Sequence, residues 1–359
     1  MKLINFSAGP AMLPRSVLEQ ARDELVDYGG AGMSLVEMSH RGPEYPAVHE
    51  QAVALARRVF EVPADFSVLF LQGGATLQFS MVPMNLLCPG KAGGYVVSGA
   101  WAKKAIADGR LYGDAYAAWD GAGVHYCRMP RPEEIELREG TRYLHVTSNE
   151  TIGGIQMFGW PALGVPLVGD MSSDYLSRPI PWEHFDVVYG GAQKNLGPAG
   201  VTLVFLRQAI LESTNRGLGA YLRYGYHDDG NSLANTPPVF AIWLVGKVLC
   251  WVEKQGGLGA MEAASRRRAG ILYAAIDASG DFYRSPVEPT SRSLMNVVFR
   301  LPTDDLEERF LAEAAAAGLV GLKGHRSVGG CRASIYNAMS VEGVEALAGF
   351  MAQFRAANG

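Results

Sequence analysis

One lysine, Lys194, lies in a glycine-rich segment between two apolar runs, and this placement suits a nucleophilic amine. The runs, residues 185–189 and 201–206, are short and rich in β-branched side chains, so both are predicted strands. Lys194 is then expected in a strand-to-strand turn at the rim of a core. Loss of water there disfavours its charged form and makes the neutral amine available to a carbonyl such as pyridoxal phosphate. A solvated loop lysine fits the same local pattern.

Three further features could complete a site for such a cofactor. Asp170 ends the apolar run 165–169, and a carboxylate at a strand end could pair with a pyridine nitrogen, although it could equally cap a helix. The segment Gly73-Gly74-Ala75-Thr76 joins a predicted strand to a predicted helix, where backbone amides can hold a phosphate. An ordinary tight turn is the alternative. Trp101 begins a helix after a strand and offers a flat face for stacking, or simply belongs to the core.

Cationic side chains could bind an anionic substrate. Alternation along residues 332–336 places Arg332 on the polar face of a predicted strand, where its guanidinium could grip a carboxylate or form a surface ion pair. Two His-Arg pairs lie beside glycines and suit a dianionic phosphate, though plain surface loops would look the same. They are His40-Arg41 and His325-Arg326.

The elements that must position these residues alternate between strands and helices. Such alternation predicts an α/β fold, a mainly parallel sheet covered by helices, followed by a small α+β domain. The glycine cluster at residues 256–259 is the expected boundary, giving an extended segment over 1–15, a large domain over 16–255 and a small domain over 256–359. Strands are predicted at residues 68–71, 95–98, 143–147, 165–169, 185–189, 201–206, 294–299 and 332–336, and helices at 18–28, 48–59, 77 onward, 99–106, 240–253, 261–277, 303–317 and the C-terminus.

Composition excludes several classes of function. The 359 residues carry a net charge of −4 without a basic run, so nucleic acid is not an expected partner. Four scattered cysteines suggest neither a metal site nor a disulfide framework, and a reducing, cytoplasmic location is expected. No secretory signal is recognised, and the apolar stretch 239–252 is interrupted by Lys247 and too short to span a membrane. The glycosylation pattern Asn149-Glu150-Thr151 is therefore expected to be accidental.

Taken together, the motifs resemble the phosphoserine aminotransferases, pyridoxal-phosphate enzymes of fold type I and class V, from end to end. The fold implied is a large domain with a mainly parallel seven-stranded sheet plus a small α+β domain. The matching segments are residues 5–14, Ser39-His40-Arg41-Gly42, Ser148-Asn149-Glu150-Thr151, residues 190–200, Asn235-Thr236-Pro237-Pro238 and residues 323–338.

The resemblance implies a role for each candidate residue. Lys194 would form the Schiff base, Asp170 would pair with the pyridine nitrogen and Trp101 would stack on the ring. Thr151 and Gln193 would hydrogen-bond the cofactor. Its phosphate would be held by Ala75 and Thr76 and, from a second subunit, by Asn235 and Thr236, which implies a homodimer with active sites at the interface. Arg332 would bind the substrate α-carboxylate, and the substrate phosphate or the glutamate side chain would be held by His40, Arg41, His325 and Arg326.

The implied reaction is a ping-pong transamination. L-Glutamate would leave as 2-oxoglutarate, and 3-phosphohydroxypyruvate would become O-phospho-L-serine in serine biosynthesis. A related four-carbon pair of pyridoxine biosynthesis, 3-hydroxy-2-oxo-4-phosphooxybutanoate and 4-phosphohydroxythreonine, is an expected secondary activity. Some family members have an arginine where this chain has Thr76, so fewer cations are expected from that loop.

Three alternatives follow from weaker readings of the same residues. A serine–glyoxylate aminotransferase and a cysteine desulfurase share the fold type, and a desulfurase would need a catalytic thiol, for which Cys331 is the nearest candidate. A non-enzymatic binding module would leave Lys194 as a plain loop residue.

Overall fold

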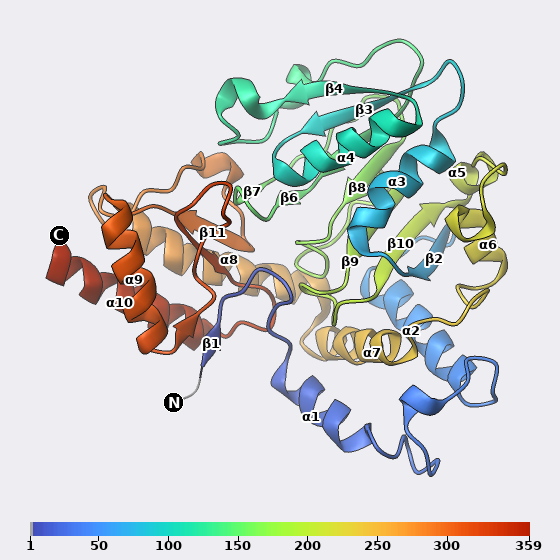
Figure 1. Cartoon of the computed structure of the whole chain (residues 1–359), viewed down its shortest axis with the longest axis horizontal. Coiled ribbons are helices and arrows are strands. Elements are labelled where there is room, and N and C mark those ends of the chain that lie inside the picture. Colours follow the sequence, from blue (N-terminus) through green and yellow to red (C-terminus); the bar gives the residue numbers. More distant parts are fainter. Residues whose placement is uncertain (1–2) are drawn as a thin grey trace.

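A computed structural model of the chain describes residues 3–359, and a seven-stranded sheet forms its centre (Figure 1). The strand order is β2-β10-β9-β8-β5-β3-β4. Strand β10 is the one strand of this sheet that runs opposite to the other six, so the expected mainly parallel sheet is confirmed. The strands are β2 (Phe66–Leu71), β3 (Ala92–Val97), β4 (Asp114–Asp120), β5 (Thr141–Thr147), β8 (Leu167–Asp170), β9 (Val187–Gly191) and β10 (Thr202–Arg207).

Helices cover both faces of this sheet. Along β10, Leu203 and Phe205 join one core with α2 (Tyr45–Val59) and α7 (Val239–Lys254). Val204 and Leu206 point the other way, into a core with α3 (Gly74–Leu86) and α4 (Ala100–Tyr112). Because both faces of the sheet are buried, the sequences of the central strands are continuous apolar runs rather than alternating ones.

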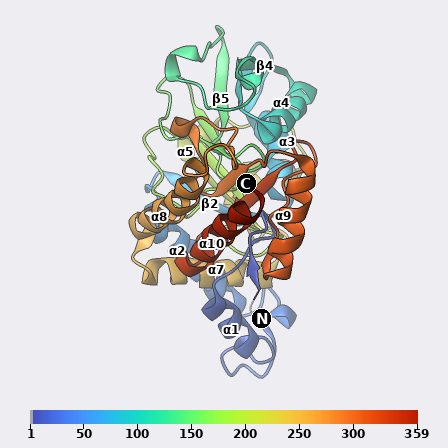
Figure 2. The same cartoon turned by 90° about the vertical axis from the view of Figure 1, so that its left-hand side faces the viewer.

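The C-terminal part of the chain builds a separate core beside the sheet, seen at the left of Figure 1 and facing the viewer in Figure 2. Here β11 (Asn296–Phe299) pairs with β13 (Cys331–Ser334), and the helices are α8 (Gly257–Asp277), α9 (Asp304–Ala316) and α10 (Val341–Asn358). The N-terminal β1 (Ile4–Asn5) pairs with β12 (Leu319–Val320), and Phe6 is buried in the same core. The N-terminal segment therefore packs against the C-terminal core rather than against the central sheet.

The remaining elements are short connections. They are α1 (Arg15–Glu24), α5 (Gln208–Glu212), α6 (Tyr224–Asp229), β6 (Asn149–Glu150), β7 (Ile155–Gln156) and the 3₁₀ turns η1 (Leu35–Glu37), η2 (Gly121–Val124), η3 (Pro132–Glu134), η4 (Ala220–Leu222) and η5 (Pro289–Ser291). Among residues 3–359, no helix has the length and apolarity that crossing a bilayer requires.

Four helices, α1, α2, α3 and α8, begin three or four residues earlier than their apolar patterns predict, and a glycine precedes two of them. Helix α3 starts at Gly74 rather than near Leu77, and α8 starts at Gly257 rather than Met261, so most of the glycine cluster is helical. In each case the preceding glycine, Gly73 or Gly256, adopts a left-handed conformation with φ of 87° or 99°. Glycine makes this sharp entry inexpensive, whereas a hydrophobic pattern shows only where the buried face begins.

Candidate active site

Lys194 lies in the connection from β9 to β10 and is buried, with 8% of its surface exposed. Its Nζ donates a hydrogen bond of 2.7 Å to Thr151 Oγ1. Burial lowers the pKa of Lys194 to about 8, while the negative charges of Asp170 and Glu150 act in the opposite direction. A neutral amine is therefore accessible near neutral pH, and Lys194 is not a solvated loop residue.

Asp170 ends β8, and β9 beside it leads to Lys194. Ser172 donates to Asp170 Oδ1 through its amide, at 2.9 Å, and through its hydroxyl, at 2.6 Å. The Ser172 hydroxyl also accepts the Gly191 amide at 3.2 Å, which ties the carboxylate to the lysine segment. Turns follow Asp170 rather than a helix, so it is not a helix cap. Burial raises the pKa of Asp170, because a buried carboxylate without a cationic partner is less stable in its charged form.

Trp101 is the second residue of α4, and its ring faces the lysine. The Lys194 Nζ lies 5.6 Å from the ring centroid. A second lysine, Lys104 one turn further along α4, has its Nζ 4.4 Å from the same centroid. The indole Nε1 is buried without a hydrogen-bond partner in residues 3–359, and the ring remains partly exposed. Trp101 therefore borders the site and is not plain core.

Helices α3 and α4 each follow a strand of the central sheet, and they differ in what their first-turn amides bind. In α3, which contains Ala75 and Thr76 in its first turn, no side chain caps these amides. In α4, the amides of Trp101 and Ala102 donate to the Glu150 carboxylate at 3.1 and 2.9 Å. Of the two helix N-termini, α3 is the one left open to bind an anion.

Glu150 was not predicted as a site residue. It lies in β6 with none of its surface exposed, directly before Thr151, and burial raises its pKa to about 7. The only signal in the sequence was that Glu150 belongs to the matching segment Ser148-Asn149-Glu150-Thr151, in which only Thr151 was assigned a role. A glutamate between polar residues does not by itself reveal that a helix terminus will cover it.

Arg332 approaches the same region from β13. Its Nη1 lies 3.4 Å from the Thr151 carbonyl oxygen, the long limit of a hydrogen bond. On the same side of the chain, Ser334 and Tyr336 both bind Asn296, whereas Cys331 and Ala333 belong to the C-terminal core, so the predicted alternation is correct. No carboxylate within residues 3–359 forms an ion pair with Arg332, which leaves its guanidinium available to a ligand.

His325 and Arg326 lie in the loop between β12 and β13, shortly before Arg332 in the chain. The pKa of His325 is lowered by partial burial first, and then by the positive charges of Arg332, Arg326 and Lys104. These cationic groups are therefore close enough to affect one another. Lys104 is a further residue that the sequence did not single out, because an exposed helical lysine has no distinguishing pattern.

The other predicted residues are not joined to Lys194 within the chain. His40 and Arg41 follow η1, where His40 is buried with an unpartnered Nε2 and Arg41 is exposed. In the described residues, neither has a side-chain hydrogen bond or ion pair to the site. The Asn235-Thr236 segment contacts the loop before α3 through one bond of 3.1 Å from Gln72 Nε2 to the Thr236 carbonyl. Gln193 contributes its carbonyl to the Ala11 amide at 2.9 Å.

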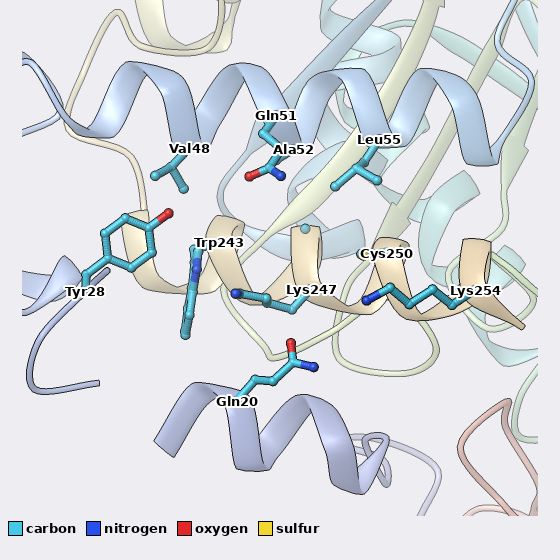
Figure 3. A pocket seen from close by; sticks show the side chains of 11 residues that line it. Gln20, Tyr28, Val48, Gln51, Ala52, Leu55, Trp243, Lys247, Cys250 and Lys254 are labelled. Atoms are coloured by element: carbon cyan, nitrogen blue, oxygen red, sulfur yellow. The ribbon is translucent and has the colours of Figure 1, made fainter. Parts of the chain in front are cut away.

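A separate cavity of about 160 Å³ lies between α1, α2 and α7 (Figure 3). Trp243 and Lys247 line it from α7, and Lys247 is paired with Glu24 at 2.7 Å. None of the predicted site residues lines this cavity. Within residues 3–359, no cluster of His, Cys, Asp and Glu side chains could hold a metal ion.

Comparison with known proteins identifies the family and the fold. The family model described as aminotransferase class-V matches residues 3–347. A phosphoserine aminotransferase from Geobacillus kaustophilus is 52% identical over 98% of both chains. The solved phosphoserine aminotransferase from Bacillus circulans subsp. alkalophilus is 49% identical, with a TM-score of 0.98 over 100% of this chain and 99% of that one.

A third relative was solved with pyridoxal phosphate bound. It is the phosphoserine aminotransferase from Trichomonas vaginalis, 36% identical, with a TM-score of 0.93 over 98% of this chain and 100% of that one. These matches extend over nearly the whole length of every chain compared, so the expected fold type is confirmed. The chain belongs to the class-V aminotransferases and, among them, to the phosphoserine aminotransferase family.

Proposed function

We propose that this protein is a phosphoserine transaminase that exchanges an amino group between L-glutamate and 3-phosphohydroxypyruvate, with pyridoxal phosphate as its cofactor. The observation that carries the proposal is the buried Lys194, hydrogen-bonded to Thr151 and electrostatically coupled to the buried Asp170. An amine and a carboxylate in one dry site suit an aldehyde that carries a basic ring nitrogen.

The residues around Lys194 fit this cofactor. Both hydrogen bonds from Ser172 go to Asp170 Oδ1, so Oδ2 can accept a hydrogen bond from a protonated ring nitrogen. The uncapped first turn of α3, with Ala75 and Thr76, suits the phosphate, and the partly exposed Trp101 ring suits stacking. Thr151 and Gln193 would add hydrogen bonds. When bound, pyridoxal phosphate supplies the carbonyl carbon and the electron-withdrawing ring that transamination requires.

Lys194 would act both as the attachment point and as the base. With a pKa of about 8, its Nζ is able to take the α proton of the amino acid and to return a proton in the reverse half-reaction. Asp170 would keep the ring nitrogen protonated because its negative charge lies in a buried, low-dielectric environment. Thr151 would hold Nζ in position while the substrate enters.

The substrate would be recognised by its two anionic ends. Arg332, free of carboxylate partners in residues 3–359, would bind the α-carboxylate through its bidentate fork. His325, Arg326 and Lys104 would hold the phosphate of phosphoserine or the side-chain carboxylate of glutamate. Since Thr76 is uncharged, Lys104 would supply a cation from α4 instead. The same groups would accept the phosphorylated four-carbon 2-oxo acid of pyridoxine biosynthesis as a second substrate.

A homodimer would complete this site. Leu25, Val26, Met33 and Val36 expose between 42% and 81% of their surface, in the segment just before His40 and Arg41. Such a group of exposed apolar side chains is typical of an interface. We propose that this face meets a second copy, so that His40, Arg41, Asn235 and Thr236 act across the interface.

Two smaller expectations are proposed with it. We place the division between the large and small domains at Gln255-Gly256, the break between α7 and α8, with residues 1–15 as an N-terminal segment. We also propose a cytoplasmic location, for which the four free cysteines are suited.

The geometry speaks against the desulfurase alternative. Cys331 is buried in the C-terminal core, on the face of β13 opposite Arg332, and burial raises its pKa to about 12. A mobile, reactive thiolate needs the reverse: exposure and a low pKa.

Spectroscopy and turnover test the proposed function. The purified protein should bind pyridoxal phosphate with a visible absorption band that borohydride removes, and Lys194→Ala should lose the band while the exposed-lysine control Lys91→Ala keeps it. Phosphoserine should be turned over, and serine, alanine and cysteine should not. A protein that takes up no cofactor, or that accepts serine but not phosphoserine, would refute the proposal.

A further inference from the structure

Glu150 and Thr151 are adjacent in the chain, yet each holds a different part of the site. The Thr151 hydroxyl accepts the Lys194 Nζ at 2.7 Å. The Glu150 carboxylate accepts the Trp101 amide at 3.1 Å and the Ala102 amide at 2.9 Å. We infer that Glu150 is a positioning residue of the proposed transaminase, whose carboxylate anchors the first turn of α4 and so places the Trp101 ring against Lys194. This inference rests on the proposed function, because the ring is useful there only as a cover for the cofactor.

The space for this contact is built into the backbone. Gly99 precedes α4, and a Cβ added to it would lie 2.6 Å from the Glu150 Cδ. The φ of Gly99 is 176°, an extended conformation that any residue adopts. Glycine is therefore needed at this position for the room it leaves to the carboxylate, not for its backbone conformation.

A buried acid must be stabilised by its surroundings. None of the Glu150 surface is exposed, and the two helix amides together with the positive end of the α4 dipole supply the compensation. These two amides lower the pKa of Glu150 while burial raises it to about 7, and the ionised form makes the stronger hydrogen bonds to them. A negative charge on Glu150 also raises the pKa of Lys194, against the larger effect of burial.

Glu150 also decides which helix can bind the phosphate. Helices α3 and α4 each begin shortly after a strand of the central sheet, and either N-terminus could attract an anion. At α4 the Trp101 and Ala102 amides already donate to the Glu150 carboxylate, so they are not free to bind a phosphate. The anchor therefore directs a phosphate to the uncapped end of α3 while it fixes the orientation of Trp101 at α4.

Two substitutions test the anchor in different ways. Glu150→Gln keeps the shape but replaces one accepting oxygen by a donor, and Gly99→Ala crowds the carboxylate without changing its charge. Gly270→Ala on α8 is the control, because nothing lies within 4 Å of its added Cβ. After circular dichroism shows that all three fold, hydrogen exchange is measured on the cofactor-free proteins for the peptide covering residues 99–104. The visible ellipticity of the cofactor band is measured on the loaded proteins.

We expect the amides of this peptide to exchange about tenfold faster in Glu150→Gln and Gly99→Ala than in wild type or the control. The visible ellipticity should fall in the same two variants, because the ring is no longer held over the cofactor. Unchanged exchange in both variants would refute the anchor, and faster exchange with wild-type ellipticity would show a helix cap without a positioning role. A wild-type protein that binds no cofactor would refute the proposed function instead, since the exchange measurement does not need the cofactor.

Discussion

Thr151→Val should make Lys194 more reactive in the cofactor-free protein. The threonine hydroxyl accepts a 2.7 Å hydrogen bond from a lysine that is 8% exposed, and valine has the same shape without the acceptor. Loss of this bond destabilises the ammonium form more than the neutral amine, so the pKa of Lys194 falls further below about 8.

The size of the effect follows from the kind of bond. A buried hydrogen bond to a charged group contributes about 1.5–3 kcal/mol, which corresponds to a roughly ten- to hundredfold change in the ratio of amine to ammonium. With a pKa of about 8, on the order of one tenth of the wild-type lysine is neutral at pH 7. In Thr151→Val, the neutral form should become the major form at the same pH.

Competitive labelling measures this directly. The cofactor-free protein is treated with an amine-selective reagent across a pH series, and the Lys194 peptide is quantified by mass spectrometry. Thr151→Ser retains the hydroxyl and serves as the matched control, with a wild-type profile expected. An unchanged midpoint in Thr151→Val would show that the hydroxyl does not stabilise the ammonium, and the electrostatic description of the site would be wrong.

Two other predictions concern the cations of the site. Lys104→Met should raise the KM for phosphoserine by about fivefold, as expected for loss of a partly screened charge. Lys103→Met should leave the KM unchanged, because the Lys103 Nζ lies over the Tyr126 ring, 3.9 Å from its centroid, and not over Trp101. Equal KM values in both variants would remove Lys104 from the phosphate site. The pKa of Lys194 is about 8 in the folded protein and 10.5 in the unfolded chain, so the unfolded chain binds more protons between these pH values. The free energy of unfolding of the cofactor-free protein, measured with urea, should therefore rise with pH across that window by roughly 3 kcal/mol relative to Lys194→Met. Parallel pH profiles of the two proteins would contradict the burial of an ionisable amine.

The parts of the site that were predicted best from the sequence are the residues at the ends of strands. The apolar runs on either side of Lys194 predicted β9 and β10, and the run before Asp170 predicted β8. In a sheet covered on both faces, strand ends are visible as the points where apolar residues stop. Chemistry at those points therefore follows from local sequence, and the resemblance of the motifs then specified the cofactor.

The parts missed depend on distant segments that meet at a helix terminus. Glu150 precedes Thr151 by one residue, but its role arises because α4 begins beside it, about fifty positions earlier in the chain. Lys104 acquires its relation to His325 in the same way. Strand β4 was missed for a local reason, since its alanines favour helix more than strand. Spacing shows which face a residue takes within its own element, and not which other element will cover it.

The ionisation of Lys194 is set by opposing contributions, and this opposition explains why buried acids surround a lysine that must lose its proton. Burial alone favours the neutral amine, which attacks a carbonyl but has no proton to return. Asp170 and Glu150 counter burial, while Arg332 adds to it, and the balance leaves a pKa of about 8. Both forms are then populated near neutral pH, as a group that takes and returns a proton requires. A change at any of the three charged neighbours should therefore act on the reaction through Lys194, even where it leaves the cofactor and substrate contacts intact.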